Sequence, residues 1–284
     1  MVFARSSLSA SRHAGAATLS TLPRFASLLI LAGGLALAGC AQPQPPSAED
    51  AAALAPTEAA ETVAEVAAKQ APETYQALLD SHGVPFQVPA TGKAILVNVP
   101  SYELIAFEDG EPVLRSRVIV GRDIAGDRTP EMTTETSVVR FRPTWRPTPM
   151  MIRRGDYEDK TWPPGRNNPL GLLAIRLEPG MLIYLHGTNR PELFDKQGRA
   201  LSGGCVRVER WDEVAAWVLD VDVDEVHRLA NGDRTFDMDT SGVPVMVRYF
   251  TQFPDADGEL QAHADIYGQG GSSYGVAMDV AALQ

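Results

Sequence analysis

The pattern of apolar and polar positions becomes regular from Lys93 onward, where the two kinds alternate as they do in β-strands. "AILVNVP" and "YELIAF" show this two-residue period, and "VLRSRVIVG" follows after "EDGEP", a turn with Asp109-Gly110 at its centre. "SVVRFRP", "MLIYLHG" and "VPVMVRYF" are further strand candidates. The pattern predicts a mostly β domain over residues 93–252, a size at which one core can form.

Three segments repeat apolar residues at helical spacing instead. "ETYQALLDSHG" predicts a short helix that ends at Gly83. "ERWDEVAAWVLD" is amphipathic, with Trp211, Val214, Ala215 and Val218 on one face and acidic residues on the other. "VDVDEVHRLAN" predicts a second short helix directly after it. The predicted fold is therefore a sheet with short helices attached.

The segments outside this domain differ in composition. Residues 40–72 are rich in Ala, Pro and Glu and contain no aromatic residue, so they predict a tether rather than a packed core. Residues 73–92 form a helical lead-in, and residues 253–284 are expected to be a C-terminal tail.

The N-terminus has the features of a secretory signal. An apolar run extends from Phe25 to Leu37. It is preceded by Arg5, Arg12 and Arg24, and the segment contains no acidic residue. This run is shorter than the roughly 20 residues that a membrane-spanning helix needs. The run ends in "LAGC", which resembles the lipobox of bacterial lipoproteins. The resemblance implies cleavage after residue 39 and a diacylglycerol on the sulfur of Cys40. An ordinary secretory signal and an uncleaved anchor are the alternatives.

This resemblance also implies a location. Lipoproteins with Asp after the lipidated Cys are usually retained at the inner membrane, whereas Ala41 stands here. We therefore expect the chain to be anchored in the outer membrane of a Gram-negative bacterium and to face the periplasm.

Net charge and cysteine count limit the partners and the disulfide bonds that the chain can have. Without residues 1–39, the chain has 22 basic residues (25 − 3) against 36 acidic ones, a net charge near −14. A nucleic-acid partner is not expected, because phosphate binding needs a basic face. If Cys40 is acylated, Cys205 has no disulfide partner, and a lone thiol in an oxidising compartment is either buried and inert or kept for its reactivity.

Candidate chemistry centres on Cys205 and His186. A thiol attacks carbonyls as the thiolate and needs a base, for which His is the usual choice. His186 ends the apolar segment "MLIYLH", and Cys205 follows Gly203 and Gly204, which cannot obstruct a substrate. A buried, inert Cys and a structural His are the alternative for this pair.

Two motifs carry a resemblance to a known family. His186-Gly187-Thr188 and the later Ser202-Gly203-Gly204-Cys205-Val206-Arg207 resemble the signature of the L,D-transpeptidases, the YkuD-type cysteine enzymes of bacterial cell walls. "NVPSYELIAFEDGEPVLRSRVIVGR", "FRPTWRPTP" and "PPGRNNPLG" resemble further segments of the family's large Gram-negative branch. The resemblance runs from about residue 93 to 250 and implies a β-sandwich or barrel-like sheet with one or two short helices.

The resemblance implies a role for each matching residue. Cys205 would be the nucleophile and His186 the base, held in its productive tautomer by the carbonyl of Gly187. The amides of Gly203, Gly204 and Cys205, in the turn that Ser202 begins, would form the oxyanion hole. Arg207 would position this loop or a substrate carboxylate, with an ion pair to Glu209 as the alternative.

The implied reaction is transfer on peptidoglycan. Cys205 would attack the bond between diaminopimelate and the terminal D-Ala of a tetrapeptide stem, release D-Ala and pass the acyl group to an amine. The family usually has His where this chain has Gly203, which leaves open the acceptor and the rate. Hydrolysis by an L,D-carboxypeptidase or endopeptidase, and a non-catalytic wall-binding protein, are the alternatives.

Other polar residues suggest less. Trp145, Arg146, Arg153 and Arg154 either flank the cleft or belong to a solvated loop. His82, His227 and His263 lack metal-ligand spacing, so no metal and no cofactor are expected. The sequence identifies no activating protein partner.

Overall fold

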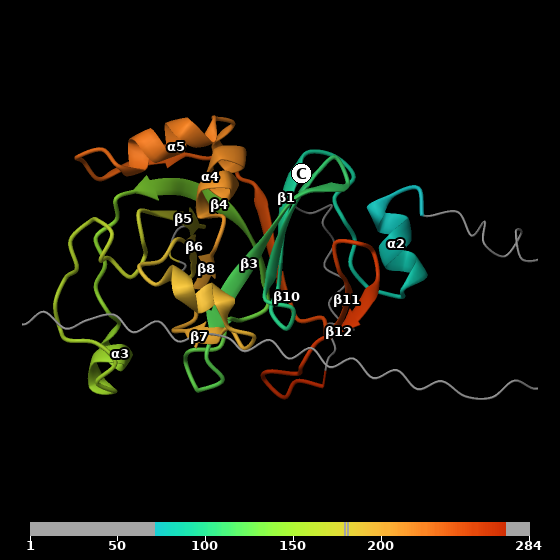
Figure 1. Ribbon diagram of the computed structural model, residues 1–284, viewed down its shortest axis with the longest axis horizontal. Coiled ribbons are helices and arrows are strands. Elements are labelled where there is room, and N and C mark those ends of the chain that lie inside the picture. Colours follow the sequence, from blue (N-terminus) through green and yellow to red (C-terminus); the bar gives the residue numbers. More distant parts are fainter. Residues whose placement is uncertain (1–71, 179, 181, 271–284) are drawn as a thin grey trace, which may run out of the picture. The chain divides into compact units, whose positions relative to one another are not determined.

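The computed structural model describes residues 72–270 except residues 179 and 181 (Figure 1). The predicted signal peptide, Cys40, the tether up to residue 71 and the tail beyond residue 270 lie outside the described residues. Within the described part of the chain, no helix combines the length and the apolar character that crossing a bilayer requires.

The helices and strands follow one another in a single order along the described chain. They are α2 (Tyr75–Ser81), β1 (Lys93–Asn98), β2 (Glu103–Glu108), β3 (Glu111–Gly121), β4 (Met132–Phe141), α3 (Pro149–Arg153), β5 (Leu173–Leu177), β6 (Tyr184–His186), the 3₁₀-helix η2 (Pro191–Asp195), β7 (Ala200–Ser202), β8 (Val206–Val208), α4 (Trp211–Leu219), α5 (Val223–Ala230), β9 (Phe236–Asp239), β10 (Pro244–Arg248), β11 (Gln252–Pro254) and β12 (Leu260–Ala262).

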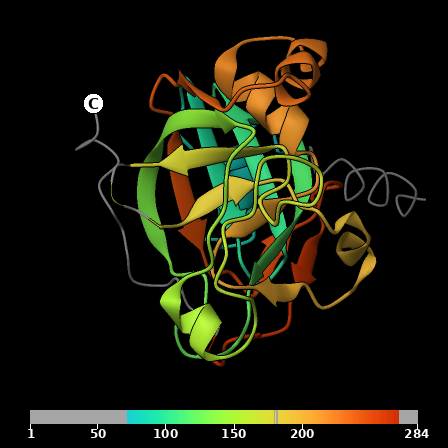
Figure 2. The same ribbon diagram turned by 90° about the vertical axis from the view of Figure 1, so that its left-hand side faces the viewer.

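The main sheet closes on itself. Its strand order is β10-β1-β2-β3-β8-β6-β5-β4-β9, and β10 also pairs with β4, so the path returns to its start as a barrel (Figures 1 and 2). Most neighbours are antiparallel, whereas β1–β10 and β6–β8 are parallel. The mostly β, barrel-like fold that we predicted is therefore confirmed.

One apolar core fills the barrel and continues under two helices. It includes Ile95 and Val97 of β1, Val118 of β3 and Phe141 of β4, all with no exposed surface. Val214, Ala215 and Val218 of α4, with Val226 and Ala230 of α5, join the same cluster. The face that we predicted for the helix now seen as α4 is thus the one that packs on the sheet.

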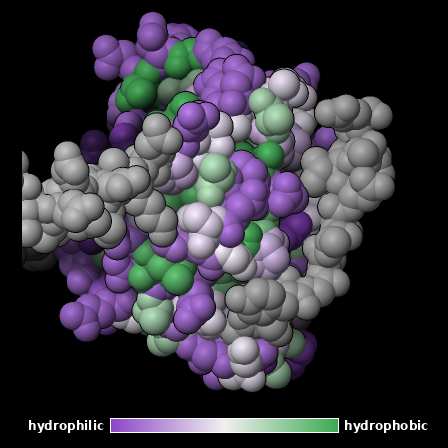
Figure 3. Space-filling model, turned by 90° about the vertical axis from the view of Figure 1, so that its right-hand side faces the viewer, coloured by the Kyte–Doolittle hydropathy of each residue, from purple (hydrophilic) through white to green (hydrophobic). Residues whose placement is uncertain are grey.

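A second core covers the outer face of β1, β2 and β10. The alternate residues of β1, Ala94 and Leu96, contact this cluster, which also contains Leu79 of α2 and Phe253 of β11. Figure 3 shows the outside of this region as a mainly polar surface with scattered apolar residues. Because both faces of β1 are covered, five of its six residues are buried.

The longest predicted elements are present, and several short ones were not predicted. The turn between β2 and β3 has positive φ at both Asp109 (50°) and Gly110 (86°), as a two-residue hairpin turn requires. The helix α3, the 3₁₀-helix η2 and the hairpin of β11 and β12 were not predicted. Residues 253–270, expected to be a tail, therefore begin in a strand, and Tyr267 is buried.

Candidate active site

The register of two parallel strands brings the candidate nucleophile and base to one face. Leu185 of β6 pairs with Val206 of β8, and His186 pairs with Arg207. Leu185 and Val206 belong to the barrel core, so His186 and Arg207 point away from it. Cys205 precedes Val206 and by the same alternation shares the face of Arg207. The strand β8 lies between Cys205 and the predicted amphipathic helix, which begins at Trp211 as α4.

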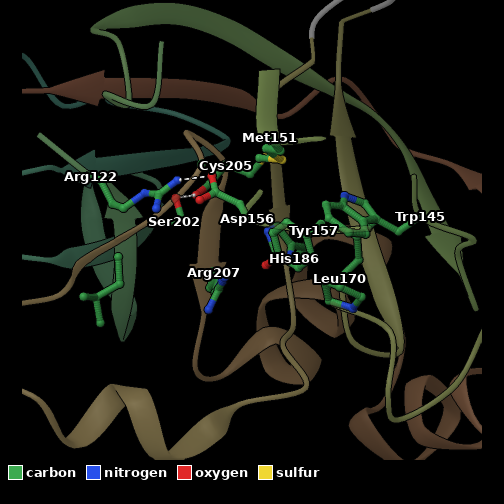
Figure 4. A pocket seen from close by; sticks show the side chains of 13 residues that line it. Arg122, Trp145, Met151, Asp156, Tyr157, Leu170, His186, Ser202, Cys205 and Arg207 are labelled. Atoms are coloured by element: carbon green, nitrogen blue, oxygen red, sulfur yellow. Dashed lines mark hydrogen bonds and ion pairs between the residues drawn. The ribbon is translucent and has the colours of Figure 1, made fainter. Parts of the chain in front are cut away.

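This face lines a cavity of about 200 Å³ (Figure 4). Its walls come from the end of β3, the segment between β4 and β5, and the strands β6, β7 and β8. The lining residues are Arg122, Trp145, Met151, Asp156, Tyr157, Pro169, Leu170, His186, Leu201, Ser202, Gly203, Cys205 and Arg207.

His186 is held as a neutral imidazole. Its side chain is buried, and Nδ1 lies 2.6 Å from the carbonyl oxygen of Gly187. A carbonyl only accepts hydrogen bonds, so Nδ1 carries the proton and Nε2 is left unprotonated. Burial, with a smaller contribution from the positive charge of Arg207, lowers the pKa of His186 to about 3. At neutral pH the imidazole is therefore neutral, with Nε2 as the nitrogen that can accept a proton, and the backbone of Leu170 is a second hydrogen-bonding neighbour of the ring.

Cys205 is held as a thiol. Its Sγ donates to the carbonyl oxygen of Leu182 at 3.3 Å. Burial raises the pKa of Cys205, against the lowering effects of the Tyr184 amide and the charge of Arg207. Among the described residues, no hydrogen bond joins Sγ to His186. The resting pair is therefore neutral, and the two groups share the cavity without direct contact.

The turn before Cys205 offers two amides rather than three. Ser202 Oγ accepts from the amide of Gly204 at 3.1 Å and donates to the carbonyl of Cys205 at 2.5 Å. The Gly204 amide, which we expected in the oxyanion hole, already has this partner. The amides of Gly203 and Cys205 donate to no other described residue, so they are the available donors.

Met151 occupies the space beside Gly203. A Cβ atom at position 203 would lie 2.1 Å from Cε of Met151, which projects from α3. This is the position at which the resembled family usually has His. A side chain at position 203 could be accommodated only if Met151 moved. The thioether of Met151 thus forms the wall of the cavity on this side.

Arg207 carries a positive charge into the cavity. It forms no ion pair with a described carboxylate, and Glu209, the alternative partner, is bound by Arg117 instead. The Tyr157 hydroxyl is its neighbour, and burial lowers the pKa of Arg207. A half-buried guanidinium without a described carboxylate partner is suited to a carboxylate ligand.

The other basic residues near the cleft have different positions. Of the four residues proposed to flank it, only Trp145 lines the cavity, where it packs against Tyr157. Arg146 pairs with Asp159, and Arg154 pairs with Asp127 and Asp156. Arg153 is exposed at the end of α3.

Sequence reasoning missed several lining residues. Arg122, Met151, Asp156, Tyr157 and Leu170 lie far from the two motifs in the sequence. Arg122 and Leu170 stand in segments that resemble the family, but nothing local showed that they line the cavity, and no quoted segment contains Met151, Asp156 or Tyr157. Among the described residues, no group of three or more His, Cys, Asp or Glu side chains is arranged to hold a metal ion.

Comparison with known proteins agrees with the motifs. The family model YkuD, described as the L,D-transpeptidase catalytic domain, matches residues 92–245, more than half of the chain. A Haemophilus influenzae protein named "Putative L,D-transpeptidase" is 30% identical over an alignment of 224 residues, which covers 64% of this chain and 45% of that protein. The chain thus spans less than half the length of this relative.

Solved structures of L,D-transpeptidases are more distant. The enzyme from Mycobacterium smegmatis has 17% identity and a TM-score of 0.36, with 55% of this chain and 58% of that chain covered. L,D-transpeptidase 3 from Mycobacterium tuberculosis has 14% identity and a TM-score of 0.36, with 55% and 61% covered. The extent of the family match, which includes both motifs, decides the assignment: the chain belongs to the YkuD family of L,D-transpeptidase catalytic domains.

Proposed function

We propose that the chain is a cysteine L,D-transpeptidase that acts on peptidoglycan tetrapeptide stems, with Cys205 as nucleophile and His186 as base. The observation that carries the proposal is the register of β6 and β8, which turns both side chains to one cavity, together with the tautomer fixed by Gly187. A neutral imidazole with an unprotonated Nε2 is the form that can take the thiol proton.

The proposed first step is acylation. Cys205 gives up its hydrogen bond to Leu182 and transfers its proton to Nε2 of His186 as Sγ attacks the carbonyl between diaminopimelate and D-Ala. The amides of Gly203 and Cys205 donate to the developing oxyanion. Collapse breaks the peptide bond, His186 returns the proton to the departing amine of D-Ala, and a thioester remains on Cys205.

The proposed second step regenerates the enzyme. An amine of an acceptor attacks the thioester and gives its proton to His186, and the departing thiolate of Cys205 then takes that proton. Arg207 is the group that would bind a carboxylate of the stem, since it lines the cavity without a described carboxylate partner. We also propose lipid attachment at Cys40 and an outer-membrane position facing the periplasm, on the basis of "LAGC" and Ala41.

Mass spectrometry of the purified full chain with muropeptide tetrapeptides tests the reaction, with Cys205→Ala as the comparison. We expect release of D-Ala, an acyl adduct on the protein and a new dimer mass, all absent with Cys205→Ala. Loss of D-Ala without a dimer, even with added amine, would favour hydrolysis. Neither an adduct nor D-Ala would favour a non-catalytic wall-binding protein. A carbapenem should also acylate Cys205.

A further inference from the structure

The C-terminal segment reaches the back of the catalytic turn. Tyr267 lies 22 residues beyond the end of the family match at residue 245, and its side chain is only 3% exposed. Its amide donates to the hydroxyl of Tyr249 at 2.7 Å, and the two rings stack 5.6 Å apart. The segment is thus fastened to the barrel at Tyr267 rather than lying loose on its surface.

The hydroxyl of Tyr267 belongs to a hydrogen-bond network with Thr129. It donates to the carbonyl of Gly121 at 2.7 Å and accepts from the amide of Thr129 at 3.1 Å. Thr129 Oγ1 accepts from the amide of Gly121 at 2.9 Å and donates to the carbonyl of Gly204 at 2.8 Å. Each of the two hydroxyls donates one hydrogen bond and accepts one, so both are fully used within the network. Burial raises the pKa of Tyr267, which keeps this donor protonated.

The last bond of this network fixes the peptide that precedes the nucleophile. The described residues contain no cis peptide bond, so the carbonyl of Gly204 and the amide of Cys205 point in opposite directions. The carbonyl accepts from Thr129, which is buried and does not line the cavity, and the amide therefore points to the other side of the peptide, where Cys205 lines the cavity. Gly204 has a φ of +116°, which glycine adopts without a steric clash and few other residues adopt.

We infer that Tyr267 is a positioning residue of the active site: through Thr129 it holds the Gly204–Cys205 peptide so that the Cys205 amide faces the cavity as an oxyanion donor. The role of the Cys205 amide as an oxyanion donor rests on the proposed function. The fixed orientation of the Gly204–Cys205 peptide does not. The segment after residue 245 would then be part of the active-site structure, although it lies outside the matched domain.

Tyr267→Phe removes the hydroxyl and keeps the ring that stacks on Tyr249. Thr129→Val removes the bond to Gly204, and Thr129→Ser is the conservative variant that retains it. Tyr75→Phe is the matched control, because Tyr75 is also buried and its hydroxyl accepts from Arg115 on the far side of the sheet.

The first measurement is hydrogen–deuterium exchange in peptides that cover residues 202–208 of the full chain. We expect faster exchange in Tyr267→Phe and Thr129→Val, and exchange as in the unaltered chain for Thr129→Ser and Tyr75→Phe. Unchanged exchange in Tyr267→Phe would overturn the inference, whether or not the chain proves to be a transpeptidase.

The second measurement separates positioning from general damage. Acylation by a carbapenem passes through an oxyanion, whereas alkylation of Cys205 by iodoacetamide does not. Because loss of one oxyanion donor costs about 100-fold or more, its misorientation in Tyr267→Phe should slow acylation by about 10-fold or more. Alkylation should change by less than about twofold. An equal loss in both reactions would indicate a merely structural role. If the unaltered chain is not acylated, the proposed function fails, and exchange alone decides the positioning role.

Discussion

Burial acts on Cys205 and His186 in opposite directions. It raises the pKa of the thiol and lowers that of the imidazole, because each charged form loses its hydration. Both groups are therefore neutral at physiological pH, and in the proposed mechanism charge separates only when the thiol attacks. The positive charge of Arg207 favours the thiolate and disfavours the imidazolium, so in the proposed mechanism it would assist Cys205 without creating an ion pair beforehand.

The neutral pair predicts how the thiol reacts with pH. In the Cys40→Ala chain, whose only thiol is Cys205, the rate of alkylation by iodoacetamide should rise with pH. Its midpoint should lie above the roughly 8.5 of an ordinary thiol, because a raised pKa means less thiolate at pH 7. Glutathione measured under the same conditions is the reference. A rate that is already at its plateau at pH 6 would reveal a preformed thiolate–imidazolium pair and contradict this account.

Gly203 and Met151 predict a coupled pair of substitutions. Gly203→His should lower the free energy of unfolding by about 1–3 kcal/mol, because its Cβ would lie 2.1 Å from Met151 Cε. Met151→Ala should relieve part of this cost, since it removes the side chain that must move. Urea denaturation of both single variants and the double variant measures the coupling.

Gly198→His is the control for this pair, because a Cβ at Gly198 meets nothing within 4 Å and no positive φ strains it. It should change stability little. Additive effects of Gly203→His and Met151→Ala would show that the two positions do not compete for one space.

At the scale of elements, α2 and β11 stabilise the barrel from outside. Leu79→Ala should lower the free energy of unfolding by about 2–5 kcal/mol, because Leu79 is completely buried in the second core. Leu78→Ala, one residue earlier on the same helix, is the control, since Leu78 is only partly buried. Denaturant melts compare the two, and equal losses would mean that α2 does not dock through Leu79.

Elements with several periods of their apolar pattern were the easiest to predict from the sequence. The strands β1 to β4 and the helices α4 and α5 each show several periods of their apolar pattern, so they were predicted from local sequence. The helix α3 has five residues, none of them buried, and too few turns to show a period. The ion pair of Arg154, just after α3, with Asp127 is a tertiary contact that the local sequence does not show.

At the scale of the whole molecule, lipid attachment at Cys40 is a separate prediction. Expressed in a Gram-negative host, the full chain should be recovered with membranes and carry the mass of the lipid. Cys40→Ser should move it to the soluble periplasmic fraction, because the thioether-linked lipid cannot form. Cys205→Ser is the matched control and should stay with the membrane. A full chain that is soluble and lacks the added mass would refute the lipobox assignment.

The sequence by itself determined the mostly β fold and the family and predicted the Cys205–His186 pair, because strand periodicity and the two motifs are local properties of the chain. The carbonyl of Gly187 could also be named in advance, since it belongs to the residue next to His186, and it lies within hydrogen-bonding distance of Nδ1. Tertiary structure alone decided what surrounds that pair. Barrel closure places Met151 beside Gly203 and brings Tyr267 to Gly121. The direction of the Ser202 hydroxyl decides that it binds the Gly204 amide. Closure brings residues 146 positions apart into contact, and the linear order of residues carries no direct signal of such a meeting.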